Sequence, residues 1–106
     1  MGSVGREQSL VIAERILDHE REDGRTSEVR VVVFRPAYIQ SLGVWTCEFQ
    51  ILGLDDDQIR DAHDVDSLGA LVSALAIVRE LLEYHRRAGA RLTWLGDAEL
   101  DILGKD

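Results

Sequence analysis

Residues 66–87 of this chain, DSLGALVSALAIVRELLEYHRR, decide which fold the sequence can adopt. On a helix that turns about 100° per residue, the large apolar side chains of this stretch gather within an arc of about 80°. They are Leu68, Leu71, Leu75, Val78 and Leu82, and the stripe is widened by Ala70, Ala74, Ile77 and Leu81. A stripe this broad is typical of a helix that covers a sheet, because a coiled-coil seam is narrower.

Both ends of this stretch favour a helix with defined limits. Asp66 is a good N-cap, because its carboxylate can accept hydrogen bonds from the free amides of the first turn. Arg86 and Arg87 stand at the other end, where the helix dipole favours cations, and Gly89 suits the position that follows a helix. The sequence therefore predicts one helix that begins after Asp66 and runs to about Arg87.

Residues 44–52, VWTCEFQIL, supply the surface that this helix needs. The apolar side chains alternate strictly with polar ones along the stretch, which is the period of a strand with one buried face. The buried set is Trp45, Cys47, Phe49 and Ile51, and the opposite set is Thr46, Glu48 and Gln50. We expect the helix to lie against the first set.

Other segments complete the predicted sheet. Residues 28–34 are rich in valine, and Pro36 is expected to end that strand or to limit it to a sheet edge. Residues 10–17 are interpreted as a strand, although Ala13, Glu14 and Arg15 favour a helix. The remaining expectations are loops over 18–27 and 37–43, a short fourth strand over 58–63, and a return to the sheet over 91–95.

The predicted fold class is α+β. It has an antiparallel sheet of three or four strands in ββββα order, one long amphipathic helix packed on one face, and a C-terminal segment returning to the sheet. The 106 residues fit one domain, so we expect a flexible N-terminus over 1–9, a single domain over 10–103 and a tail over 104–106.

Composition limits the classes of function. The 20 acidic and 12 basic residues give a net charge of -8, which repels nucleic acid and anionic lipid. No apolar stretch approaches the roughly 18 residues of a membrane span, and no signal peptide is recognisable at the start. The single cysteine, Cys47, forms no internal disulfide. We therefore expect a cytoplasmic protein that binds neither nucleic acid nor membrane.

An acidic segment is the most conspicuous candidate site. It contains Asp55, Asp56, Asp57, Asp61, Asp64 and Asp66, with His63 among them. Oxygen-rich clusters can bind calcium or magnesium, but the spacing here lacks the glycine and the final glutamate of an EF-hand loop. The aspartates equally suit turns and helix caps, or a surface for a basic partner. We predict no metal site and no cofactor.

The remaining reactive side chains favour structural roles. Cys47 is predicted to be buried, where apolar surroundings raise the pKa of a thiol and weaken it as a nucleophile. His85 falls near the middle of the apolar arc, as a partly packed histidine or a pH-sensitive contact. Trp94 is either a core residue or a half-exposed interface anchor. No catalytic residue is predicted.

Three motifs carry a resemblance to a known family. They are W-x-C-x-F-x-I-x-G-L over 45–54, V-D-S-L-x-A-L-x-x-A-L over 65–75 and L-T-W-L-G over 92–96, together with the opening VIAER of 11–15. The chain resembles a family of small single-domain bacterial proteins of unknown function, a resemblance that implies no site residues. Its order of elements is also similar to the antitoxin half of some toxin–antitoxin pairs.

These observations leave three hypotheses on function. The first is a non-catalytic protein-binding domain, with self-association included. The second is an immunity or antitoxin-like protein that neutralises a basic partner through its acidic surface. The third is a small metal-dependent hydrolase that uses His63 and its aspartates. The residues expected to bind a partner are Asp55, Asp56, Asp57, Asp61 and Trp94.

Overall fold

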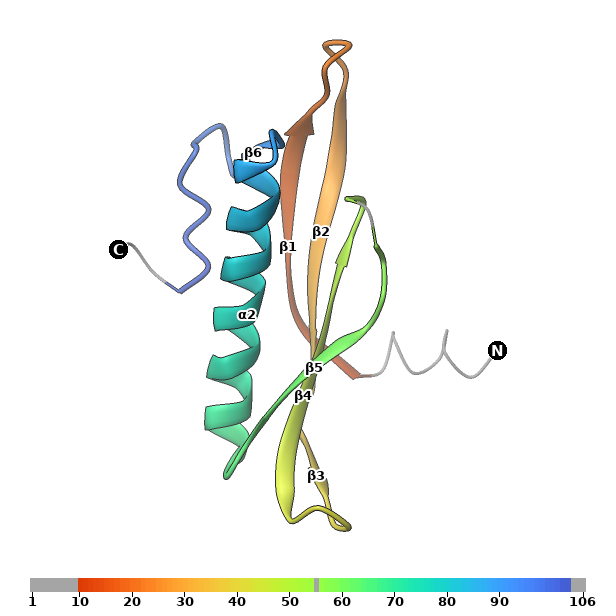
Figure 1. Ribbon diagram of the computed structural model, residues 1–106, viewed down its shortest axis with the longest axis vertical. Helices are drawn as coiled ribbons and strands as arrows, with labels where there is room; N and C mark the ends of the chain where they lie inside the picture. The colour runs from red at the N-terminus through yellow and green to blue at the C-terminus, as the bar shows by residue number, and fades with distance from the viewer. Residues whose placement is uncertain (1–9, 55, 104–106) are drawn as a thin grey trace.

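One helix and one antiparallel sheet make up the fold (Figure 1). The structure, a computed structural model, describes residues 10–54 and 56–103, so the predicted flexible N-terminus and tail, and Asp55, lie outside the described residues. The strands are β1 (Val11–Glu20), β2 (Thr26–Phe34), β3 (Ala37–Ile39), β4 (Val44–Leu52), β5 (Arg60–Asp64) and β6 (Arg91–Thr93), and the helix is α2 (Ser67–Arg87).

Strand β4 is the centre of the sheet, because three strands pair with it. Trp45 pairs with Tyr38 of β3 and with Asp64 of β5, so these two strands lie on opposite edges of β4. Phe49 pairs with both β2 and β5, which places β2 on the same edge as β3. On the far side of β2 follow β1 and then β6, and every pairing is antiparallel.

The α+β class and the antiparallel sheet are confirmed, but the expected strand count and the ββββα order are wrong. The sheet has six strands, and the chain order is βββββαβ. Residues 37–39, expected in a loop, form β3 because the chain turns back at Gly43, whose φ is +67°, and pairs with the start of β4. Pro36 separates β3 from β2, since proline cannot donate to the ladder.

Strand β1 is longer than expected. It runs to Glu20, and a short turn with Gly24 at φ +85° connects it to β2, where the sequence suggested a loop over 18–27. The helix-favouring run Ala13–Glu14–Arg15 is held extended because each of these residues pairs with a valine of β2. Tertiary pairing overrides local propensity here.

Helix α2 has the predicted limits. Asp66 caps it, with its Oδ1 accepting a hydrogen bond from the Gly69 amide at 2.7 Å. The helix ends at Arg87, and Gly89 follows at φ +111°. Its last turn contains three basic side chains, His85, Arg86 and Arg87. Positive charge at this position interacts favourably with the negative end of the helix dipole.

The face of α2 that packs on the sheet is rotated from the predicted face. The fully buried side chains recur every fourth residue, at Ala70, Ala74, Val78 and Leu82. Leu68, which the wheel placed in the buried stripe, is 67% exposed. The reason is the close approach of the first turn to β5: a Cβ atom at Gly69 would lie 2.7 Å from Cγ of Asp64. Small residues allow that approach, and the larger Leu68 is left facing outward.

The core lies between α2 and the sheet. On the sheet side it contains Cys47, Phe49 and Ile51 of β4, as predicted, with Trp45 partly buried beside them. Valines of β2, Leu17 of β1 and Ala62 of β5 extend it across the sheet. Leu92 of β6 and Leu100 close the remaining side, so the chain after the helix is part of the core.

The C-terminal segment, residues 94–103, begins with a tight hairpin. The amides and carbonyls of Trp94 and Asp97 bond reciprocally at 2.8 and 2.9 Å. Leu95 and Gly96 form the tip, with φ values of +54° and +82°, a conformation that costs a leucine roughly 1 kcal/mol. Part of this segment was predicted to pack, and Leu100 is indeed buried.

The rotation of α2 gives a direct test of the packing. Leu82→Ala removes a side chain that is almost fully buried, so we expect a loss of about 2–5 kcal/mol in the free energy of unfolding. Leu68→Ala is the matched control. Because Leu68 is exposed, its removal should change the free energy of unfolding by no more than about 0.5 kcal/mol. Urea unfolding at equilibrium measures both. Equal losses in the two variants would contradict the packing described above.

Candidate functional site

The aspartates after β4 shape a turn. Oδ1 of Asp57 accepts a hydrogen bond from the Gly53 amide at 3.1 Å, and Oδ1 of Asp56 accepts one from the Gln58 amide at 3.0 Å. The second carboxylate oxygen of Asp56 lies 3.3 Å from Nη2 of Arg60. Both carboxylates are exposed, and both hold the backbone between β4 and β5 in shape.

Strand β5 brings an aspartate and a histidine together. Nε2 of His63 lies 3.1 Å from Oδ2 of Asp61, and both side chains are about half exposed. Ala62 between them is buried against the core, so the Asp61–His63 pair lies on the opposite face of the sheet.

The last two aspartates belong to the start of α2. Asp64 accepts hydrogen bonds from the Val65 amide at 2.6 Å and from Oγ of Ser73 at 3.4 Å. Asp66 is the N-cap. The acidic segment is therefore spread over a turn, a strand and a helix start, and within residues 10–54 and 56–103 no three potential ligands come together around a metal position.

Trp94 lies partly buried against the core, beneath an arginine. The guanidinium carbon of Arg15 is 3.7 Å from the centre of the Trp94 ring, a cation–π contact. Nη1 of Arg15 also donates to the carbonyl oxygens of Leu100 and Asp101, at 2.8 and 2.7 Å. One side chain of β1 thus holds both halves of the C-terminal segment, a role that sequence reasoning missed because no local signal marks it.

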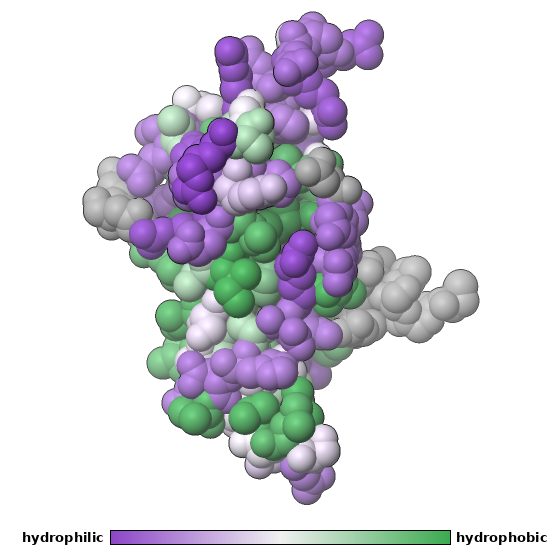
Figure 2. Space-filling view, in the orientation of Figure 1, coloured by the Kyte–Doolittle hydropathy of each residue, from purple (hydrophilic) through white to green (hydrophobic). Residues whose placement is uncertain are grey.

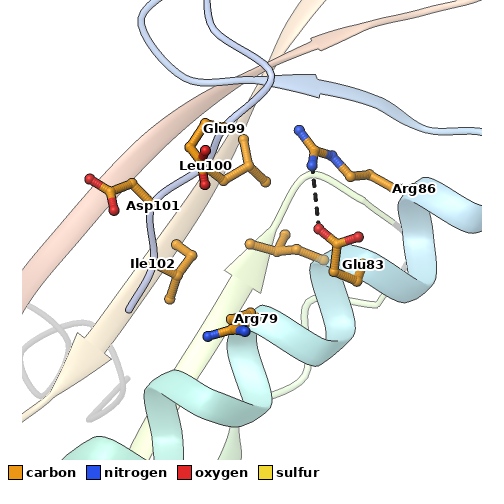
Figure 3. A pocket seen from close by; sticks show the side chains of 8 residues that line it. Arg79, Glu83, Arg86, Glu99, Leu100, Asp101 and Ile102 are labelled. Carbon is orange, nitrogen blue, oxygen red and sulfur yellow. Dashed lines mark hydrogen bonds and ion pairs between the residues drawn. The ribbon is translucent and has the colours of Figure 1, made fainter. Parts of the chain in front are cut away.

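A small cavity lies between α2 and the C-terminal segment (Figure 3). It is lined by Arg79, Leu82, Glu83, Arg86, Glu99, Leu100, Asp101 and Ile102. Arg86 crosses its upper end, contacting Glu83 at 3.3 Å, the Leu92 carbonyl at 2.9 Å and the Ala98 carbonyl. The volume of about 60 Å³ is far below the roughly 300 Å³ or more of small-molecule pockets, so the cavity suits ordered water better than an organic ligand.

Cys47 is buried, as predicted. Its side chain is 0% exposed, and its thiol donates a weak hydrogen bond to the Phe34 carbonyl at 3.4 Å. Burial raises the pKa of the Cys47 thiol, because the apolar surroundings disfavour the thiolate. His85 is partly buried, with its ring edge-on to Tyr84 at 5.4 Å between ring centres.

Exposed apolar side chains gather at one end of the molecule. They come from the β3–β4 hairpin and from the start of α2, and we call this surface the apolar end: Tyr38, Leu42, Val65, Leu68 and Val72. Each of the five residues is between 48% and 83% exposed. Figure 2 shows hydrophobic side chains at the end of the molecule that carries the β3–β4 turn. Sequence reasoning missed this surface because it assigned Leu68 to the core.

These features define a small α+β domain with one helix packed on an antiparallel sheet. The family profile described as a domain of unknown function (DUF6968) matches residues 13–103, so the chain belongs to this family and the resemblance is confirmed. No curated protein and no solved structure matches the chain. Among residues 10–54 and 56–103, no helical segment combines the length and the hydropathy that a membrane span requires.

The role of Arg15 can be tested by substitution. Arg15→Ala removes two charge-assisted hydrogen bonds and the contact with Trp94, so we expect a loss of about 1–3 kcal/mol in unfolding free energy. Amides of residues 98–102 should exchange with deuterium faster in this variant. Arg91→Ala is the control, because the exposed Arg91–Glu20 pair at 3.6 Å contributes little. Unchanged exchange in Arg15→Ala would contradict the role given to Arg15.

Burial of Cys47 predicts a pH dependence of stability. A raised pKa means that the folded protein keeps the thiol proton at pH values where the unfolded chain has lost it. The buried thiol contributes fully to the free energy of unfolding below its ordinary pKa of about 8.5. This contribution is lost as the pH rises toward the higher pKa of the thiol in the folded protein, by at most about 1.4 kcal/mol per pH unit. Unfolding free energy measured between pH 8 and 10 should therefore fall more steeply than in Cys47→Ala. If unfolding free energy fell equally with pH in the unaltered protein and in Cys47→Ala, the prediction would be wrong.

Proposed function

We propose that this chain is a non-catalytic protein-binding domain and that the apolar end is its contact surface. The observation that carries the proposal is the gathering of Tyr38, Leu42, Val65, Leu68 and Val72 at one end, each about half exposed or more. Scattered exposed leucines are ordinary, but apolar side chains gathered in one region are typical of interaction sites.

The composition of the apolar end supports this proposal. Full burial of a valine or leucine side chain contributes about 1.5–3 kcal/mol, so a few such residues suffice for a specific contact. Tyr38 adds an aromatic ring, which lies 5.7 Å from the Trp45 ring and is thereby held in place. Asp64 and Asp66 stand beside Val65 and Leu68 and supply the polar rim that interfaces usually have.

The positions of the reactive groups also support a binding role. Cys47 is enclosed in the core, Ser73 hydrogen-bonds to Asp64, and Asp66 caps the helix. These groups stabilise the fold through contacts that a catalytic role would have to break.

An immunity or antitoxin-like protein is the second candidate. The net charge of -8 and the exposure of Asp56, Asp57 and Asp61 favour it, since such a surface would steer a basic partner. Arg60 and His63 lie next to two of these carboxylates and reduce the local negative charge. The hydrolase hypothesis has less support, because in the described residues His63 contacts Asp61 without a third candidate ligand.

Site-specific photo-crosslinking tests the apolar end. A photoreactive amino acid is placed at position 68 in the full chain, expressed in its native cells, and compared with the same amino acid at position 22. Both positions are exposed, but Leu68 lies in the apolar end and Glu22 lies in the β1–β2 turn. We expect a discrete adduct from position 68, because the crosslinker there is covered by the partner, and none from position 22.

A second substitution tests whether the adduct at position 68 depends on the apolar character of this surface. Val72→Asp introduces a charge into the apolar end at an exposed position, so the adduct at position 68 should be lost while the thermal midpoint stays nearly unchanged. If positions 68 and 22 give the same adducts, or if Val72→Asp leaves the adduct intact, the apolar end is not the contact surface.

A further inference from the structure

Strand β5 forms an edge of the sheet. Its five residues pair with β4, from Asp64 opposite Trp45 to Arg60 opposite Phe49, and no other strand in the described part of the chain pairs with it. In Figure 1 it runs from the middle of the sheet to the start of α2. The outer edge of such a strand presents N–H and C=O groups to which another chain can bond.

The sequence of β5 is complementary to itself. It reads Arg60-Asp61-Ala62-His63-Asp64. When two copies are set antiparallel about Ala62, Arg60 of each copy lies opposite Asp64 of the other, and Asp61 lies opposite His63. Both opposed pairs thus join an acidic with a basic side chain. Opposite charges across antiparallel strands are favourable, and like charges there are unfavourable.

The side chains of β5 permit such an approach. Ala62, at the centre, is small and faces the core. Asp61 and His63 lie on the opposite face, about half exposed, and already contact one another at 3.1 Å. In the pair of copies each Asp61 would lie between two histidines, its own and that of the second copy, while Glu48 of β4, opposite Asp61 in the register, adds a further carboxylate on this face.

The position of α2 adds an apolar contact to the same arrangement. The helix packs chiefly on β4 and β5. A two-fold axis that passes midway between the two Ala62 residues, perpendicular to the sheet, would place both helices on one face, antiparallel to each other. Because neighbouring strands are about 4.8 Å apart, the helix axes would lie about 10 Å apart, which is an ordinary packing distance for helices.

The flank of α2 that would face the second helix carries exposed apolar side chains. Ser73 marks this flank, since its hydroxyl donates to Asp64 of β5. Ile77 and Tyr84 lie within about 40° of Ser73 on the helical wheel, and they are 37% and 61% exposed. The opposite flank, with Glu83 and Arg86, lies against the C-terminal segment. The free flank is therefore the one beside the β5 edge.

We propose that two copies of this chain pair through antiparallel β5 edges, with Ile77 and Tyr84 of the two α2 helices packed across the same two-fold axis. A two-fold dimer is the commonest assembly of soluble proteins. The inference deepens the proposed function, since it names a second copy as one partner. Asp64 borders both surfaces, but the five residues of the apolar end lie outside the β5 pairing and the Ile77–Tyr84 contact, so either proposal can fail while the other stands.

Sedimentation velocity on charge-swap variants tests the dimer. The full chain should sediment as a dimer at about 100 μM in about 0.15 M salt, where long-range repulsion between the acidic copies is screened. His63→Asp sets aspartates opposite one another, and the dimer should weaken about tenfold or more. The double variant Asp61→His/His63→Asp restores the opposed pairs and should restore the dimer.

Two further variants separate the interface from a general effect of charge. Ser41→Asp adds a negative charge at an exposed position in the β3–β4 turn and should leave the dimer intact. Tyr84→Ser removes the exposed ring from α2 and should weaken the dimer without lowering the thermal midpoint. Circular dichroism establishes that each variant is folded.

Distinct outcomes would overturn the inference. A full chain that stays monomeric at this concentration rules out the dimer. A dimer that His63→Asp leaves intact, or that the double variant fails to restore, lies on another surface. Crosslinking from position 68 reports on the apolar end, so its result in the His63→Asp variant shows separately whether the proposed function holds.

Discussion

The contact on which the structure depends is the close approach of α2 to β4 and β5. It rests on small side chains: Ala70 and Ala74 are fully buried at the contact, and Gly69 passes so near Asp64 that a Cβ atom would clash. Asp64 and Asp66 satisfy the first amides of the helix region and fix where the helix begins. Because the helix lies this close, Val78 and Leu82 form one apolar core together with Phe49 and Cys47.

Two arginines then attach the end of the chain to this core. Arg15 of β1 and Arg86 of α2 donate to four backbone carbonyls of residues 92–101, and Arg15 also covers the Trp94 ring. Backbone carbonyls of the irregular C-terminal segment, which would otherwise lack a partner, are satisfied in this way. Leu100 can therefore pack under a segment that has little regular structure of its own.

The same packing determines what the surface offers to other molecules. Since the core takes its residues at every fourth position of α2, Leu68 and Val72 turn outward at one end, and Ile77 and Tyr84 turn toward the β5 edge. The aspartates of the acidic segment are divided among a turn, a strand and a helix cap. Our proposals accordingly place protein contacts at the apolar end and along β5.

The sequence by itself determined the α+β class, the limits of the helix, the alternation of β4 and the burial of Cys47. Each of these follows from local spacing: a period of 3.6 or 2 residues, a capping aspartate, a glycine after the last turn. Residue spacing could not identify β3, which is three residues long and exists only because it pairs with β4. Nor could it show that Leu68 faces outward or that Arg15 and Arg86 meet the C-terminal segment. Those features depend on how closely elements distant in the sequence approach one another, and only the tertiary structure decides that distance.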